Sequence, residues 1–217
     1  MEKYDIVFDE EDHRYYVDGV EYPSVTTVLN FITADHYGSI SPVILDNARR
    51  RGTEVHEALE ELDYTGDCSV NPQSAGYCRA YTAFLNDYRP EWYGIEKPLY
   101  SPSQGFCGTV DRYGLINGRP AVLDIKTTSS PNRENYLSLC CQTAAYDHLV
   151  FSHHDEDESW RHTDRYGLYL RNDGTYRLFD CKEWERKNDF NAYLLFWDCL
   201  DLYKDIKEIT TPKKGRK

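Results

Sequence analysis

Basic side chains are in short supply in this 217-residue chain, where 25 Lys and Arg stand against 37 Asp and Glu and give a formal net charge of −12. This shortage argues against a protein that binds nucleic acid through its bulk charge. A nucleic-acid site would have to be local, and the sequence offers two basic runs, Arg49–Arg51 and the tail Pro212–Lys217. The alternatives are that the arginines pair with acidic residues on neighbouring helical turns and that the tail is a disordered, solvated end.

Cysteine pairs at metal-binding spacing are missing as well. The seven cysteines include no C-x-x-C pair, so the sequence gives no signal for a zinc knuckle or a ferredoxin-type cluster. Their odd number and the lack of a signal peptide predict free thiols in the cytoplasm. No apolar run approaches the ~18 residues that cross a bilayer, so no membrane is expected among the partners.

The order of the expected elements indicates an α/β fold of the mixed, α+β kind. Turn residues and hydrophobic periodicity first predict a hairpin over 4–22 that turns at Asp18-Gly19, a short helix from Ser24 or Thr26, and helices over 42–62 and 73–88. Strands over 92–100, 106–116 and 119–128 are expected next, followed by a helix over 135–151. A hairpin that turns at Asp173-Gly174 and one closing helix over 181–206 complete the predicted order. We therefore predict a central mixed β-sheet flanked by helices in a single domain over 1–210, with an N-terminal arm of hairpin and short helix over 1–40 and a basic, disordered tail over 211–217.

Two aspartates and a lysine interrupt apolar strands in the stretch GTVDRYGLINGRPAVLDIKTT. Side chains alternate along a strand, so Asp124 and Lys126 share one face. Asn117-Gly118 is a two-residue hairpin turn, and this turn brings Asp111 close to Asp124. Neighbouring carboxylates repel each other unless a hard cation such as Mg²⁺ or Mn²⁺ binds between them, and a nearby lysine can then orient or deprotonate water. The alternative is a solvent-facing salt bridge between Lys126 and either aspartate.

Two helical segments add polar side chains at one-turn spacing. In RGTEVHEALEE, Gly52, His56 and Glu60 form one stripe, where the glycine permits close approach and the imidazole can bind a metal. In QTAAY, on the helix that follows the D-x-K strand, Gln142 and Tyr146 can hold a phosphate or a base edge. The alternatives are a structural histidine, a solvated glutamate, a surface glutamine and a core tyrosine.

Taken together, these motifs resemble the RecB-like exonuclease branch of the PD-(D/E)XK nucleases, with G-x-x-x-H, G-x-x-D, D-x-K and Q-x-x-x-Y in that order. The matching residues are Gly52-His56, Gly108-Asp111, Asp124-Ile125-Lys126 and Gln142-Tyr146. The segments YPSVTTVL and RGTEVHEALE are also similar to small phage and mitochondrial exonucleases of this branch. The resemblance implies a restriction-endonuclease-like core.

The resemblance also implies roles for the residues of the motifs. His56, Asp111, Asp124 and the Ile125 carbonyl would bind Mg²⁺ or Mn²⁺, and Asp111, Asp124 and Lys126 would be catalytic. Gln142 and Tyr146 would position DNA. Several members of the branch hold a [4Fe-4S] cluster through one cysteine before the core and three near the C-terminus; this chain lacks that set, so no iron–sulfur cluster is expected.

Further residues are candidates outside the motifs. Glu96 and Glu60 are candidates to contact a second metal or a water, although a solvated helix face explains Glu60 as well. Ser24 and Thr26 are candidates to bind phosphate, and the alternative for them is capping of the short helix. The arginine run and the tail are expected on the side where DNA enters; these residues are Arg49, Arg50, Arg51 and Lys213–Lys217.

The expected function is a metal-dependent DNA exonuclease that hydrolyses phosphodiester bonds from DNA ends in phage recombination or end processing, within the bacterial host cytoplasm. A structure-specific or restriction-type endonuclease is one alternative, because the same chemistry serves both. A non-catalytic DNA-binding or assembly protein that keeps the fold is the alternative of another class. DNA is the expected partner, and the resemblance adds a single-strand annealing protein and a homo-oligomer as further candidates.

Overall fold

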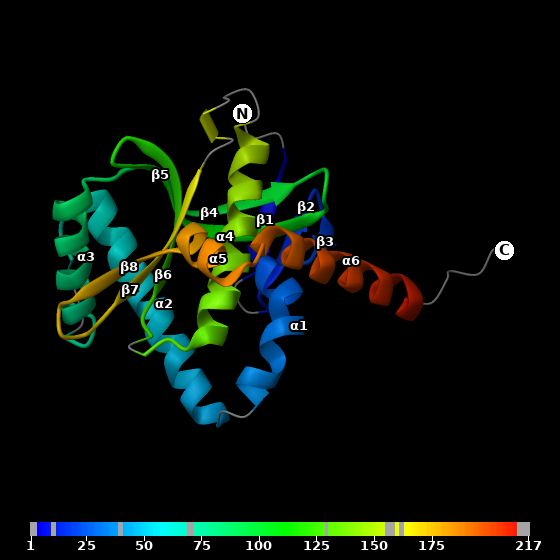
Figure 1. Ribbon diagram of the computed structural model, residues 1–217, viewed down its shortest axis with the longest axis horizontal. Helices are drawn as coiled ribbons and strands as arrows, with labels where there is room; N and C mark the ends of the chain where they lie inside the picture. Colours follow the sequence, from blue (N-terminus) through cyan, green and yellow to red (C-terminus); the bar gives the residue numbers. More distant parts are fainter. Residues whose placement is uncertain are drawn as a thin grey trace.

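The computed structural model describes residues 4–9, 12–38, 41–68, 72–128, 130–154, 159–160 and 163–211. The expected tail, Lys213–Lys217, lies outside the described residues. Within them, the chain forms a mixed α/β fold in which a five-stranded mixed sheet is flanked by helices and preceded by a small three-stranded sheet (Figure 1). This arrangement confirms the predicted mixed fold class.

The N-terminal segment forms three strands rather than the expected two. β1 (Ile6–Asp9), β2 (Arg14–Val17) and β3 (Val20–Tyr22) pair in sequence order and antiparallel. The predicted turn at Asp18-Gly19 is present between β2 and β3, and both of its residues have positive φ, as a type I′ turn requires. The extra strand is present because β1 pairs with the edge of β2 that β3 leaves free. A local turn signal does not predict this pairing.

The central sheet has the order β4-β5-β6-β7-β8. Its members are β4 (Glu91–Ser101), β5 (Phe106–Ile116), β6 (Arg119–Lys126), β7 (Asp164–Leu170) and β8 (Tyr176–Asp180). All neighbours are antiparallel except β6 and β7, which are parallel. The parallel step requires a crossover connection, and helix α4 (Arg133–His153) provides it.

Helices cover both faces of this sheet. On one face, α1 (Val25–Gly38), α4 and α6 (Ala192–Thr210) contribute to one buried cluster together with Val122 and Tyr169. On the other face, α2 (Pro42–Thr65) and α3 (Ala75–Tyr88) pack against residues of β6 and β7 such as Leu123 and Leu168. The alternation of side chains along β6 therefore sends successive residues to different helical layers.

The closing helix is divided in two, which corrects the expectation of a single helix over 181–206. α5 spans Cys181–Asn188, and the residue that caps its C-terminus, Asp189, has a φ of 49°. Asn191 then begins α6, because its side chain accepts a hydrogen bond from the Leu194 amide. An Asp and an Asn in this short connection favour a left-handed residue and a new N-cap over a continuous helix.

The expectation of seven free thiols is wrong for one pair. Cys68 and Cys78 form a disulfide that joins the segment after α2 to α3. The other cysteines are free and buried, and they are Cys107, Cys140, Cys141, Cys181 and Cys199. Among the described helices, none is both long and apolar enough to span a bilayer.

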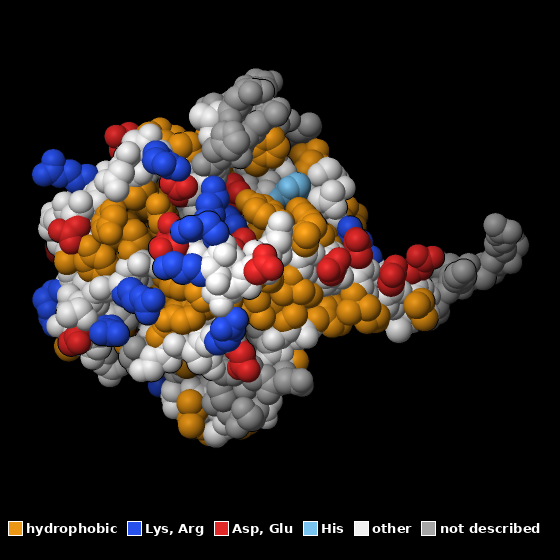
Figure 2. All heavy atoms as spheres, viewed as in Figure 1, with side chains coloured by type: hydrophobic (Ala, Val, Ile, Leu, Met, Phe, Trp, Pro, Cys, Tyr) orange, Lys and Arg blue, Asp and Glu red, His pale blue; other side chains and the backbone are white. Residues whose placement is uncertain are grey.

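Charge is unevenly spread over the face drawn in Figure 2. Lys and Arg side chains gather over the part of this face formed by β7, β8 and α5, whereas acidic side chains follow the projecting end of α6 (Figure 2). In the second half of α6, Leu202, Ile206 and Ile209 are exposed. The net negative charge of the chain is therefore compatible with local basic surfaces.

Candidate metal and catalytic site

The registers of β4, β5 and β6 align three carboxylates across neighbouring strands. Arg112 pairs with Leu123, so Asp111 lies opposite Asp124 one position further on. The pairs Ile95–Arg112 and Lys97–Val110 flank Glu96 and place it level with Asp111. The sheet therefore carries Glu96, Asp111 and Asp124 in one row, although like charges in adjacent strands repel each other.

Glu96 owes its direction to an unusual backbone conformation. Its φ is 43° within β4, in the left-handed region that a residue with a Cβ rarely adopts. Such a residue costs of order 1–3 kcal/mol and persists only where its surroundings fix it. Here the carboxylate accepts from Arg112 Nη1 at 2.9 Å and lies 3.0 Å from His56 Nδ1. The strained residue therefore belongs to the site and not to a surface loop.

His56 projects from the middle of α2 and faces the row of carboxylates. Its Nδ1 lies 3.0 Å from Glu96 Oε1 and 3.9 Å from Asp111 Oδ2, and its Nε2 lies 3.2 Å from the Ile125 carbonyl oxygen. Both ring nitrogens thus face acceptors, and this arrangement favours the doubly protonated imidazole. The predicted approach of His56 to Asp111 and to the Ile125 carbonyl is present in the structure.

Burial and neighbouring charges shift the pKa values of these groups in different directions. Burial by itself lowers the pKa of His56, but Asp111 and Glu96 outweigh it and raise the pKa to about 9. Burial raises the pKa of Asp111 to about 7, where His56 opposes the shift and Asp124 adds to it. The pKa of Glu96 is lowered, because His56 and Arg112 outweigh its burial. A protonated imidazole and a readily protonated aspartate therefore share one site.

The donor set fits a divalent cation. Ligand atoms of His56, Glu96 and Asp111 all lie within 4.8 Å of one another. Asp124 lies outside this group, but its buried Oδ1 has no hydrogen-bond donor among the described residues, and a cation would satisfy it. Carboxylate oxygens with one imidazole suit Mn²⁺, and Mg²⁺ to a lesser degree. Glu96, expected only at a second metal or a water, is thus central to the group.

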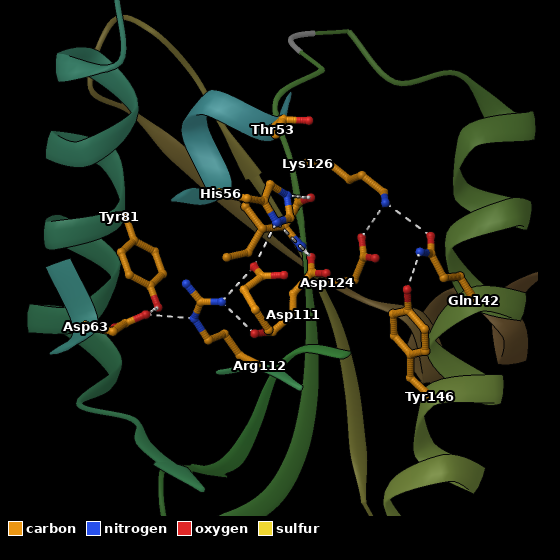
Figure 3. Close-up of polar contacts among 12 residues, drawn as sticks. Thr53, His56, Asp63, Tyr81, Asp111, Arg112, Asp124, Lys126, Gln142 and Tyr146 are labelled. Atoms are coloured by element: carbon orange, nitrogen blue, oxygen red, sulfur yellow. Dashed lines mark hydrogen bonds and ion pairs between the residues drawn. The ribbon is translucent and has the colours of Figure 1, made fainter. Parts of the chain in front are cut away.

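Lys126 lies on the other side of Asp124 and connects the row to α4 (Figure 3). Its Nζ is 2.8 Å from Asp124 Oδ2 and donates to Gln142 Oε1 at 3.1 Å. Gln142 Nε2 in turn donates to the Tyr146 hydroxyl at 2.9 Å. Burial and the two aspartates raise the pKa of Tyr146 well above its usual value, so the phenol stays protonated. The structure thus brings the predicted Gln142 and Tyr146 to the D-x-K strand.

Glycine at position 108 makes room for this chain of contacts. A Cβ at Gly108 would lie 3.0 Å from Tyr146 Cε1 and 3.0 Å from Val25 Cγ2. These distances are shorter than ordinary van der Waals contacts, so a larger residue would displace the Tyr146 ring. Gly52 is different, because a Cβ there would meet nothing within 4 Å.

A buried network behind the row was not expected from the sequence. Arg112, which is fully buried, donates through Nε to Asp63 Oδ2 at 2.7 Å and through Nη1 to Glu96 and to the Asp111 carbonyl oxygen. The Tyr81 hydroxyl donates to the same Asp63 carboxylate (Figure 3). The only available signal was the position of Asp63, seven residues after His56 and hence on the same face of α2.

The remaining candidates have more peripheral positions. Ser24 Oγ accepts from the Thr27 amide at 3.0 Å and bonds the Thr26 hydroxyl, so Ser24 caps α1 as the alternative anticipated. Glu60 is half-buried one turn beyond His56 and lies outside the group of candidate metal ligands. The arginine run is exposed, and within it Arg50 contacts Asn47 and Glu54. A DNA contact by any of these residues stays a prediction.

Comparison of the sequence with protein-family models and with curated proteins finds no match.

Proposed function

We propose that this chain is a divalent-metal-dependent DNA exonuclease of the PD-(D/E)XK class, in its RecB-like branch, which hydrolyses phosphodiester bonds from DNA ends. The observation that carries the proposal is the row of Glu96, Asp111 and Asp124 on adjacent strands, with Lys126 beside it and His56 facing it. The mixed sheet between two helical layers fits the restriction-endonuclease-like core of that class.

Some residues of the site are placed to bind an ion, and others are placed to position the substrate. A divalent cation held by His56, Glu96 and Asp111, with Asp124 Oδ1 as a further oxygen ligand, would activate water and stabilise charge at the phosphorus. Lys126 donates hydrogen bonds next to that position, toward a phosphate oxygen or a water. Asp124 and Gln142 fix its ammonium group in place, so little side-chain entropy is lost during the reaction.

The surroundings of Lys126 support a role in orienting substrate as well. The protonated Tyr146 hydroxyl accepts a hydrogen bond from the Gln142 amide nitrogen. The oxygen of the same amide accepts a hydrogen bond from Lys126. In the proposed complex with DNA, the Gln142 amide or the Tyr146 hydroxyl would exchange its present partner for a phosphate oxygen. The resemblance adds a recombination or end-processing setting in a phage-infected bacterium, with a single-strand annealing protein as a candidate partner.

Two other functions fit parts of this geometry. A structure-specific or restriction-type endonuclease would use the same residues on internal phosphates. A non-catalytic DNA-binding or assembly protein would need only the fold, but the retained pair of aspartates with its lysine argues against this, because such a protein has no use for a buried, repulsive carboxylate row.

Digestion of end-labelled linear DNA, single- and double-stranded, tests the proposal directly. We expect cleavage with Mn²⁺ and Mg²⁺ and none with a chelator, and we expect a covalently closed circle to stay intact. Nicking of the circle would replace the exonuclease with the endonuclease. Absence of cleavage on every substrate with both metals would favour the non-catalytic protein.

Substitutions at the site provide the second test. Asp111→Ala and Lys126→Ala are each expected to lower the cleavage rate by about 10²-fold or more, because the first removes a ligand of the proposed cation and the second removes a group placed to act at the phosphorus. Lys204→Ala, which changes an exposed lysine on α6, is the control and should leave the rate within about twofold. Circular dichroism checks the fold, and a folded Asp111→Ala or Lys126→Ala variant that cleaves at the original rate would refute the site assignment.

A further inference from the structure

We propose that the DNA strand continues from the candidate site onto a second surface, where Arg133 and Arg177 bind its phosphates. This inference rests on the proposed function and specifies where the substrate lies beyond the bond that is cleaved. The surface consists of these two arginines and the aromatic side chains under them, and we call it the arginine patch. Its aromatic members are Tyr136, Phe179 and Trp184.

The registers of β6, β7 and β8 connect the candidate site to the arginine patch. Lys126 pairs with Tyr169 across β6 and β7, and Tyr169 pairs with Arg177 across β7 and β8. Residues that are level in neighbouring strands project from the same face of a sheet, and the strands are about 4.8 Å apart. The backbone of Arg177 is therefore about 10 Å from that of Lys126. This distance corresponds to about three nucleotides at the 3.4 Å rise of a DNA strand.

Aromatic rings hold the two guanidinium groups in place. Arg177 Nη1 donates to the Tyr136 hydroxyl at 2.8 Å, and its Cζ lies 5.5 Å from the centre of that ring. Arg133 Cζ lies 5.8 Å from the centre of the Trp184 ring. The rings of Tyr136 and Phe179 stack with their centroids 4.4 Å apart. A guanidinium that is already positioned by such contacts loses less conformational freedom when it binds a phosphate.

The positive charges of the arginine patch are available to a ligand. Arg133 and Arg177 are exposed, and neither forms an ion pair within the part of the chain that the structure describes. Other basic residues have acidic partners: Arg119 lies 2.8 Å from Asp164. Lys187 likewise lies 2.6 Å from Glu183. Lys and Arg side chains also gather over β7, β8 and α5 (Figure 2), so the surroundings of the patch favour an anion.

The anion that we infer is the phosphodiester backbone of the strand that occupies the candidate site. The planar guanidinium group matches two phosphate oxygens at once. Tyr136 and Trp184 are partly exposed beside the arginines, and aromatic side chains stack on bases of any sequence. This combination of cations and rings is typical of surfaces that bind single-stranded nucleic acid. Because the patch lies on the same sheet face as Lys126, one strand can contact both.

Binding of a fluorescent single-stranded DNA of about twelve nucleotides, measured by anisotropy against salt concentration, tests the inference. A chelator is present, so the strand stays intact. Arg133→Met combined with Arg177→Met removes both charges and keeps an apolar stem on each ring. We expect the affinity to fall about tenfold or more and the salt slope to fall by about 1.4, because each phosphate contact on a single strand contributes about 0.7.

The matched control combines Arg119→Met with Lys187→Met, which removes the same charge from two side chains that have acidic partners. It should keep the affinity within about twofold. Arg133→Lys combined with Arg177→Lys restores both charges and should recover most of the slope. Circular dichroism checks the fold of each variant. If the double methionine variant does not fold, Arg133→Met alone, in the first turn of α4, should still lower the slope by about 0.7.

The outcomes separate the arginine patch from the proposed activity. An unchanged affinity and slope in the folded methionine variants would overturn the inference and leave the nuclease proposal standing. Equal losses in the control would also overturn it, because bulk charge would then explain the binding. Failure of the unchanged protein to bind the strand would overturn it too, whereas digestion of end-labelled DNA decides the proposed function separately.

Discussion

At the scale of single residues, the protonation state of His56 is what the proposed cation would change. The two nitrogens of His56 face Glu96 and the Ile125 carbonyl, so the ring carries two protons in the arrangement described. For the proposed cation to bind, His56 must lose one of these protons and Asp111 must be ionised. Binding of that cation would therefore be coupled to proton release.

The sign of the resulting pH dependence follows from the raised pKa values. His56, with a pKa of about 9, is protonated at neutral pH, and Asp111, with a pKa of about 7, is partly so. Protons compete with the ion below these values, so the affinity for Mn²⁺ should rise about tenfold per pH unit from pH 7 to 9 and more steeply below pH 7.

Titration calorimetry in two buffers of different ionisation enthalpy measures this release, which should be about one proton or more per ion at pH 7. His56→Asn provides the control, because it should weaken binding and flatten the dependence above pH 7. An affinity for Mn²⁺ that is constant between pH 7 and 9 would show that Mn²⁺ does not displace a proton from His56.

At the scale of elements, the glycines in β7 and α2 have opposite effects on stability. Gly167 pairs with Asp124 across β6 and β7, and a Cβ there would lie 2.2 Å from Leu139 Cδ2 on α4. Gly52 lies inside α2, where a Cβ would meet nothing. The first glycine permits close packing of helix on sheet, whereas the second costs helix stability.

Alanine at these two positions should therefore change stability in opposite directions. Gly167→Ala is expected to lower the free energy of unfolding by about 1–3 kcal/mol, because the buried Leu139 must move. Gly52→Ala is expected to raise it by about 0.5–1 kcal/mol, because alanine is the better helix former. Urea unfolding followed by circular dichroism measures both values. An unchanged free energy of unfolding for Gly167→Ala would mean that the Leu139 side chain moves aside without cost.

At the scale of the whole molecule, the excess of acidic residues makes the position of each exposed arginine important. Arg49 lies seven residues before His56 and hence on the same face of α2. Thr53, between them, donates to the Arg49 carbonyl oxygen. Arg50 points elsewhere and contacts Asn47 and Glu54. Because of these neighbours, we expect Arg49 to contribute more to DNA affinity than Arg50 does.

DNA affinity measured against salt concentration tests this ranking. Arg49→Ala should weaken binding and reduce the salt slope by about 1, because one phosphate contact is lost. Arg50→Ala, the matched control, should have a smaller effect, since its charge is shared with Glu54. If Arg49, Arg50 and Arg51 can all be replaced by alanine with no change in the slope, DNA does not enter over this part of α2.

The sequence by itself predicted most of the elements and most of the residues that meet at the candidate site. The turns at Asn117-Gly118 and Asp173-Gly174 and the alternation along β6 depend on residues a few positions apart, so local chemistry was sufficient. The same short-range logic predicted that Asp111 and Asp124 would be neighbours, because a two-residue turn fixes the hairpin register.

Only the tertiary structure decided how these residues are partnered. His56 meets Glu96 and Ile125 over separations of 40 and 69 residues, and Arg112 meets Asp63 over 49. No periodic pattern encodes such contacts, because they depend on how α2 lies across the sheet and on the left-handed backbone at Glu96. The strand pattern supplied the carboxylates, and the packing of distant elements determined which basic side chains each of them contacts.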